Sequence, residues 1–208
     1  MPSFEEESLL QHQGYRFTAG VDEAGRGSLA GPVVAAAVIL PCGADFPFMS
    51  RVRDSKKLTP SQRESLFDYI LEAAVSTGVG MVDYDRIDSV GILEATRLAM
   101  KQAIASLSPP ADSLLIDYVH LSGIAVPQKS ITRGDDLCYS IACASIIAKV
   151  SRDRLMVKLD EAFPGYGLAR HKGYGTRDHL ACLQKLGPSP VHRRSFAPVS
   201  QMRFMEPA

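Results

Sequence analysis

Two adjacent acids and three glycines stand together in the segment AGVDEAGRGSLAGPVV, which spans residues 19–34. Asp22 and Glu23 come first, and the glycines follow at positions 25, 27 and 31. Glycine-rich loops can hold the phosphates of a nucleotide cofactor, whereas paired carboxylates can bind a divalent metal ion. The two kinds of chemistry imply different proteins, so the residues around this segment must decide between them.

The cofactor interpretation requires the pattern G-x-G-x-x-G between a strand and a helix whose N-terminus faces a pyrophosphate. Here one extra residue separates the last two glycines, and Pro32 is followed by the apolar run VVAAAVIL. That run favours a strand instead of a helix. The acids also stand immediately before the glycines, where they would repel a pyrophosphate. The pattern therefore favours a metal site.

A metal site needs further oxygen ligands, and two more acids are placed to supply them. Asp117 ends the apolar run LLID, where an unpaired buried carboxylate would be costly, and Asp135 precedes a long helical pattern. Both have simpler alternatives, because Asp135 or Asp136 could cap that helix and Asp117 could begin a turn. Successive strand residues point to opposite faces. Asp22 and Glu23 are therefore expected to share a site only if their strand ends there.

The elements that must position these acids alternate between strand and helix patterns. Thr59, Pro60 and Gln62 form the sequence signature of a helix N-terminus with a capping box. The mixture predicts an α/β protein in which helices cover a mixed sheet. Strands or extended segments are expected at 16–22, 33–40, 78–85, 113–117 and 124–132, and helices at 59–76, 91–107, 138–163 and 176–186.

The composition is that of an ordinary globular protein. The chain has 208 residues, of which 46% are hydrophobic and 22% charged, enough for one substantial domain. Its longest apolar run, residues 33–40, is far shorter than the roughly 20 residues that cross a bilayer. The acidic N-terminus does not resemble a secretory signal, and the four cysteines form no C-x-x-C pair. We expect buried free thiols, no membrane and a cytoplasmic location.

The net charge of zero conceals an uneven distribution. Residues 1–148 contain 12 Lys and Arg against 18 Asp and Glu, whereas residues 149–208 contain 11 against 5. Acids could hold cations and the basic part could bind phosphates, which suits a metal-dependent enzyme acting on a polyanion. The alternative is a chance difference between two solvated surfaces.

Several motifs together resemble bacterial ribonuclease HII. GVDEAGRGSLAGPVVAAAVIL, DSKKL, LLID, ASIIAKVSRD, YGLARHKGYGT and HRRSF occur in the order found in that family, from about Ala19 to Val199. The resemblance implies a ribonuclease H-like mixed sheet flanked by helices, with a small C-terminal helical extension. It implies one domain over 15–208, with a catalytic core at about 17–162 and a basic helical part at about 163–208.

The implied activity is endonucleolytic. The family cuts the RNA strand of RNA–DNA hybrids and single ribonucleotides embedded in duplex DNA. Hydrolysis would use two Mg²⁺ or Mn²⁺ ions and leave 5′-phosphate and 3′-hydroxyl ends. A monomer is expected. Rival hypotheses are a related nuclease or resolvase acting on DNA junctions, and a non-catalytic protein that binds hybrids.

The resemblance also assigns roles to individual residues. Only 21 residues precede Asp22 and the glycine loop contains Arg26, which disfavours the related ribonuclease HIII. The implied catalytic and metal-binding acids are Asp22, Glu23, Asp117 and Asp135. The implied substrate contacts are Gly25, Arg26 and Gly27 at the ribose 2′-hydroxyl, Tyr174 at the RNA–DNA junction, Lys56 and Lys57 at phosphates, and Arg193 and Arg194 as a backbone clamp.

Several positions depart from the family pattern. Tyr118 replaces a usual glycine close to the expected metal site, and Asp136 replaces a usual serine beside Asp135. As a fifth acid, Asp136 could compete with Asp135 for the metal ion. Ser28 stands for a usual loop proline, and HKGYGT replaces a common HKGYPT. His171 and His192 have no partner at metal-ligand spacing, so they are expected at the surface or facing phosphates.

Overall fold

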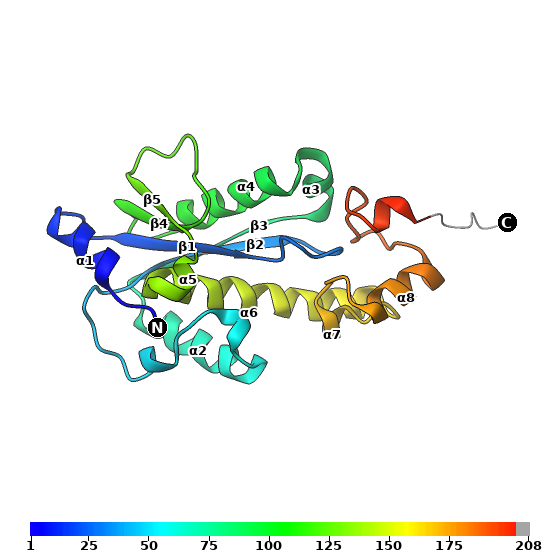
Figure 1. The fold of residues 1–208 in the computed structure, drawn as a ribbon, viewed down its shortest axis with the longest axis horizontal. Helices are drawn as coiled ribbons and strands as arrows, with labels where there is room; N and C mark the ends of the chain where they lie inside the picture. Colours follow the sequence, from blue (N-terminus) through cyan, green and yellow to red (C-terminus); the bar gives the residue numbers. More distant parts are fainter. Residues whose placement is uncertain (203–208) are drawn as a thin grey trace.

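The computed structural model describes residues 1–202, which form a five-stranded sheet with helices on both faces (Figure 1). The strand order is β3-β2-β1-β4-β5. The central strand β1 pairs antiparallel with β2 and parallel with β4, while β2–β3 is antiparallel and β4–β5 is parallel. The strands are β1 (Thr18–Ala24), β2 (Val33–Ile39), β3 (Ser76–Val82), β4 (Ser113–Asp117) and β5 (Gln128–Ile131).

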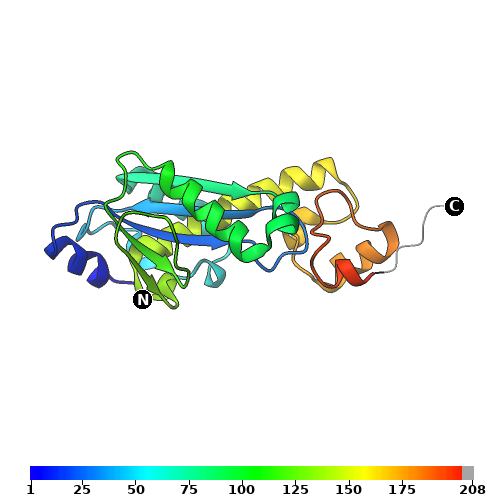
Figure 2. The same cartoon turned by 90° about the horizontal axis from the view of Figure 1, so that it is seen from above.

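One face of the sheet is covered by the long helix α6, with α2 behind it, and the other face by α4 (Figure 1). The C-terminal helices lie beyond one end of the sheet (Figure 2). This arrangement confirms the predicted mixed sheet flanked by helices. The helices are α1 (Glu5–His12), α2 (Pro60–Ala73), α3 (Tyr84–Val90), α4 (Ile92–Ala105), α5 (Gly134–Leu137), α6 (Tyr139–Ala162), α7 (Leu168–His171) and α8 (Arg177–Leu186).

The four predicted helices are present within a few residues of their expected bounds, and the capping box at Thr59 and Gln62 forms as expected. The short helices α1, α3, α5 and α7 were not predicted. The strand predicted over 78–85 ends instead at Val82, because Asp83 occupies the N-cap position of α3. The extended segment predicted over 124–132 pairs only over its last part, as β5.

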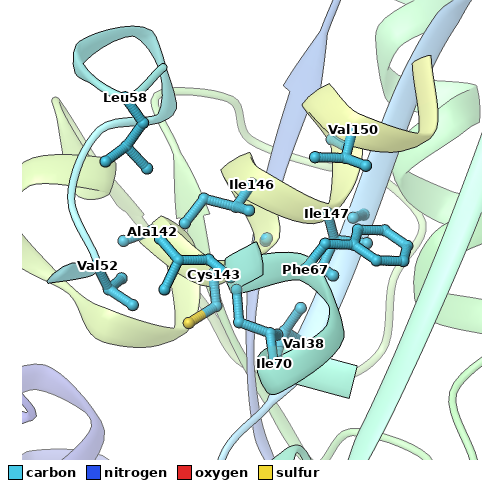
Figure 3. Close-up of a cluster of buried hydrophobic side chains, with 14 of the residues drawn as sticks. Val38, Val52, Leu58, Phe67, Ile70, Ala142, Cys143, Ile146, Ile147 and Val150 are labelled. Carbon is cyan, nitrogen blue, oxygen red and sulfur yellow. The ribbon is translucent and has the colours of Figure 1, made fainter. Parts of the chain in front are cut away.

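The core between the sheet and α6 depends on the small apolar first half of that helix. Residues 140–148 are all buried, which lets the α6 backbone approach β1 and β2 closely. Figure 3 shows side chains of α6 and α2 meeting Val38 of β2. A second cluster lies between the sheet and α4. A third joins the C-terminal part to Leu29, Ala30 and Met156, so that part packs on the loop after β1.

The four cysteines differ in burial. Cys138 and Cys143 are buried, but Cys42 and Cys182 are half-buried, so the expectation of burial is wrong for those two. All four are free thiols. Within residues 1–202, none of the helices combines the length and the apolar character required to span a bilayer.

Candidate active site

Asp22 and Asp117 are level with each other on neighbouring parallel strands. The β1–β4 register pairs Val21 with Ile116, so the next residue on each strand is one of these acids. Val21 and Ile116 point into the core on the α4 side. Because side chains alternate along a strand, Asp22 and Asp117 point toward α6. The sheet itself therefore places the first and third predicted acids together.

Asp135 joins them through the short helix α5. The backbone N–H of Gly134 donates a hydrogen bond of 2.8 Å to Oδ1 of Asp117, which ties α5 to the end of β4. Asp135 is the next residue and is 7% exposed. It lines an open cavity of about 490 Å³ together with Glu23 and Asp117. The other lining residues are Arg26, Asp54, Lys56, Lys57, Tyr118, Thr132, Arg133 and Asp136.

Glu23 reaches this cavity although its strand does not end there. The expectation that β1 must stop at the acids is wrong, since Glu23 pairs with Ala35 and the strand runs to Ala24. The pairing with β4, however, stops at Val21. Glu23 therefore lies beyond the end of the β1–β4 pairing, where it lines the cavity.

The carboxylates raise one another's pKa values. Burial raises the pKa of Asp22 well above its ordinary value, and the nearby charges of Glu23 and Asp117 raise it further. Burial also raises the pKa of Glu23, against the opposing effect of Arg26. The pKa of Asp135 is raised by burial and then by Asp54 and Asp117. A cluster of this kind becomes fully ionised most readily when cations are bound.

The donor set suits a hard divalent cation. The cluster offers carboxylate oxygens, and Oε2 of Glu23 is buried without a hydrogen-bond partner. Within the described residues 1–202, no three His, Cys, Asp or Glu side chains form a ready-made metal cage. Mg²⁺ is commonly held by one or two carboxylates, with water and substrate phosphate completing its shell. The residues therefore fit such an ion bound together with a polyanionic substrate.

The glycine loop is shaped by its first glycine. Gly25 has φ +94°, and a Cβ there would lie 2.0 Å from Nε of Arg152. Gly27 has no positive φ, and a Cβ there would meet nothing within 4 Å. The backbone conformation at Gly27 therefore does not require a glycine. Arg26 donates a hydrogen bond of 3.2 Å to Oε1 of Glu23, linking the loop to the acids.

Two fully buried arginines support the loop from behind. Arg152 donates to the carbonyl oxygens of Pro32, Ala30 and Lys172 at 2.9–3.0 Å. Arg193 donates to the carbonyl oxygens of Gly31 and Arg26 at 2.9–3.0 Å. The expectation that Arg193 contacts substrate phosphates is wrong, because its guanidinium is enclosed and each of its three nitrogens donates to a carbonyl oxygen of the protein. Burial, with the nearby charge of Arg152, lowers the pKa of Arg193 to about 9. Arg194 is exposed.

The loop containing Tyr174 is joined directly to the glycine loop. Tyr174 forms an isolated backbone bridge with Ser28, and Leu29 donates to the carbonyl of Gly173 at 2.8 Å. The Tyr174 ring is partly exposed, with the charged groups of Lys149 and Arg152 each 5.6 Å from its centre. The two loops predicted to recognise the junction are therefore joined through their backbones.

A buried histidine cluster lies under the Tyr174 loop. His171 and His192 are 8% and 1% exposed, so their expected surface positions are wrong. His179 stacks on His171 at 4.2 Å between ring centres, and its Nε2 lies 2.9 Å from Nε2 of His192. Its Nδ1 is 3.0 Å from the carbonyl oxygen of Tyr174. The cluster supports the loop and does not face solvent.

Lys56 and Lys57 lie at the rim of the cavity in the 3₁₀ turn Ser55–Lys57 and are exposed. The buried Arg63 holds that turn by donating to the carbonyl oxygens of Ser55 and Leu58. Nζ of Lys57 is already 2.6 Å from Oδ1 of Asp136.

Three residues lining the cavity were not singled out from the sequence, namely Asp54, Thr132 and Arg133. Asp54 is the first residue of the DSKKL motif, so the family resemblance could have pointed to it. Arg133 is an exposed cation that pairs with Asp136 at 2.9 Å and carries no local sequence signal of its own. Asp136 therefore pairs with two cations at the cavity that Asp135 also lines.

Comparison with known proteins identifies the family. The family model for ribonuclease HII matches residues 19–199. A ribonuclease HII of Dehalococcoides mccartyi strain BAV1 is 58% identical over 201 residues, which are 97% of this chain and 95% of that protein. One from Geotalea uraniireducens is 55% identical over 195 residues, which cover 94% and 89%. The crystal structure of ribonuclease H2 from Pyrococcus horikoshii superposes with a TM-score of 0.72 at 26% identity, covering 88% and 95%, and confirms the ribonuclease H-like fold. The chain therefore belongs to the ribonuclease HII family of ribonuclease H hydrolases.

Proposed function

We propose that this protein is an endonuclease that cuts the RNA strand of RNA–DNA hybrids and single ribonucleotides embedded in duplex DNA. The observation that carries the proposal is the grouping of Glu23, Asp117 and Asp135 around a cavity rimmed by lysines, with Asp22 buried next to Glu23 and Asp117. The products would carry 5′-phosphate and 3′-hydroxyl ends. We take the enzyme to act as a monomer in the cytoplasm, without a membrane.

The four acids would hold Mg²⁺ or Mn²⁺ ions, with Glu23 using its unpartnered Oε2. When bound, the ions lower the pKa of a water molecule and stabilise the charge on the leaving 3′-oxygen. The chain keeps the acids in place through the β1–β4 register and the Gly134–Asp117 hydrogen bond. Lys56 would neutralise the charge of a bound phosphate next to the acids.

Selection for ribose would come from the glycine loop and Tyr174. Only the 2′-hydroxyl distinguishes RNA from DNA at a given sugar. The unobstructed backbone at Gly27 leaves room for that group to approach, and Arg26 connects the loop to Glu23. Tyr174 would pack against the deoxyribose on the other side of the junction, supported by the bridge to Ser28.

Substitution of single acids tests the proposed chemistry. Asp22→Asn and Asp117→Asn should each abolish cleavage of a labelled hybrid, while binding of the hybrid in EDTA persists. Asp135→Asn should be milder, and an equal loss of cleavage in Asp136→Asn would contradict the assignment of the metal-binding role to Asp135 instead of Asp136. Wild-type cleavage that is equal with and without a 2′-hydroxyl in the substrate would favour a DNA-junction nuclease instead.

A stability measurement accompanies this test. Because the folded state raises the pKa of Asp22, its charged form destabilises the metal-free protein at neutral pH. Asp22→Asn should therefore raise the melting temperature in EDTA by roughly 2–4 °C. A fall in melting temperature together with loss of activity would mean that Asp22 is needed for folding and would not support a metal role.

The junction role of Tyr174 is tested by comparing two substrates. A single embedded ribonucleotide offers one 2′-hydroxyl. A long hybrid offers many 2′-hydroxyl groups and can bind in many registers, which compensates for the loss of one contact. Tyr174→Ala should thus lower kcat/KM at least about tenfold more on the single ribonucleotide than on the hybrid. If both activities fall in proportion to a loss of thermal stability, Tyr174 only packs the loop.

A further inference from the structure

Tyr118 follows Asp117 directly and sits in an unusual backbone conformation. Its φ is +59°, a value that favours glycine and that bulky residues adopt only at an energetic cost. The N–H of Val119 donates to the carbonyl oxygen of Asp117 at 2.6 Å, which closes a three-residue turn around Tyr118. Turns of this kind with positive φ at the central residue are rare and strained.

The surrounding structure fixes this turn on both sides. The N–H of Tyr118 donates to the carbonyl oxygen of Ile131 at 3.1 Å, and the hydroxyl of Ser130 donates to the carbonyl oxygen of Val119 at 2.9 Å. Val119 itself is buried. The backbone of Tyr118 is therefore held between the end of β4 and the end of β5, and its side chain leaves the turn in a defined direction.

That side chain is directed to the cavity and is not packed in the core. Tyr118 lines the same cavity as Glu23, Asp117 and Asp135. It is nevertheless 66% exposed, more than any other tyrosine or phenylalanine side chain within residues 1–202. An exposed ring contributes little to the core, so packing does not explain why a strained position carries a tyrosine. Strained residues of this kind cluster at functional sites.

We propose that Tyr118 is a substrate-binding residue whose ring packs against the sugar of a nucleotide next to the scissile phosphate. This inference rests on the proposed function, because it needs a nucleic acid at the acids. Adjacent Cα atoms are about 3.8 Å apart, so a nucleotide bound at Asp117 lies beside Tyr118. Bases in a duplex already stack on one another, which leaves the sugar as the apolar surface for the ring. Such contacts are independent of base sequence.

Tyr118→Gly separates this role from a structural one. Glycine relieves the positive φ, so the melting temperature should stay the same or rise. Loss of the ring should weaken binding of a fluorescent RNA–DNA hybrid in EDTA by roughly five- to tenfold. Tyr118→Phe should bind like the wild type, because the ring and not the hydroxyl makes the contact.

The matched control is Tyr69→Ala. Tyr69 is 46% exposed on the outer helix α2, where it stacks on Phe48, and it does not line the cavity. This variant should bind the hybrid with wild-type affinity.

Three results would overturn the inference while leaving the proposed function intact. They are wild-type affinity in Tyr118→Gly, a lower melting temperature in that variant that accounts for its weaker binding, and equal losses in Tyr118→Phe. If the wild-type protein itself fails to bind the hybrid, both the inference and the proposed function are wrong.

Discussion

Two neighbouring glycines of the active-site loop are glycine for different reasons. Gly25 has φ +94° and stands against the buried guanidinium of Arg152, whereas a Cβ on Gly27 would meet open space in the free protein. The first position is therefore constrained by the fold itself. The fold of the free protein places no such constraint on the second position.

Alanine substitutions at these positions should separate the two constraints. Gly25→Ala should lower the free energy of unfolding by about 2 kcal/mol or more, because the backbone is strained and Arg152 must move. Gly27→Ala should melt within about 1 °C of the wild type. It should nevertheless cleave hybrids about 10- to 100-fold more slowly, because its Cβ obstructs the approach of the substrate. Thermal melts and kcat/KM values measure both effects, and wild-type kinetics in Gly27→Ala would remove this loop from substrate contact.

The sequence motifs were enough to predict that the acids would lie together, but they did not predict which of the basic residues would be buried. The acids Asp22, Asp117 and Asp135 converge as their context suggested. Arg193 and His192 stand in the basic run HRRS, which is typical of an exposed surface. Both are enclosed in the structure, where Arg193 donates to the carbonyl oxygen of Gly31 and His192 forms a backbone bridge with Ala30, both distant in sequence. Contacts of that range leave no local signal.

Among the secondary-structure elements, long periodic helices and apolar strands were predictable, whereas single-turn helices were not. Helix α5 has only four residues, Gly134–Leu137, too few for a hydrophobic period to show. It forms because Gly134 bonds to Asp117 and because α6 begins directly after it. The element that positions the fourth acid is thus stabilised by tertiary contacts.

The element that carries Tyr174 depends on neutral histidines. Burial, with the nearby His179, lowers the pKa of His192 to about 4, and burial lowers the pKa of His179 as well. Nδ1 of His192 accepts the N–H of Ser189, and its Nε2 faces Nε2 of His179. The neutral tautomers satisfy every one of these contacts, whereas an added proton would place two N–H groups against each other.

Stability should therefore fall in mild acid. An unfolded histidine takes up a proton near pH 6.5, but His192 in the folded state resists until about pH 4. The free energy of unfolding is therefore highest above pH 6.5. It decreases by up to about 3 kcal/mol as the pH falls from 6.5 toward 4. Urea unfolding at several pH values should show a shallower pH dependence in His192→Gln than in the wild type. His120→Gln, at an exposed position, should match the wild type. Parallel curves for His192→Gln and the wild type would contradict the assignment.

At the scale of the whole molecule, the basic part from residue 149 onward is only partly available to a substrate. Arg152 and Arg193 are enclosed, while Arg194 and Lys172 retain contact with solvent. The charge balance of the sequence predicted an attraction for phosphates, but it could not show which cations serve as internal supports. That distinction depends on the packing of the C-terminal part on the loop after β1.

Salt dependence distinguishes the two kinds of arginine. In the Asp22→Asn background, Arg194→Ala should reduce the slope of log Kd against log salt by about 1, the effect of one lost phosphate contact. Arg193→Ala should instead lower the free energy of unfolding by roughly 2–4 kcal/mol, since buried carbonyl oxygens lose their donors. An unchanged slope in Arg194→Ala would remove it from the interface. A stable Arg193→Ala variant with a flattened slope would contradict its structural role.

The central claim is that the acid cluster and the glycine loop together cut nucleic acid at ribose. Its most direct test is a labelled DNA duplex with one embedded ribonucleotide, incubated with the protein and Mg²⁺ or Mn²⁺ beside an all-deoxy duplex of the same sequence. We expect one cut next to the ribonucleotide, with 5′-phosphate and 3′-hydroxyl ends, and an intact all-deoxy duplex. Equal cleavage of both duplexes, or an intact ribonucleotide duplex under conditions that cleave a continuous hybrid, would contradict the claim.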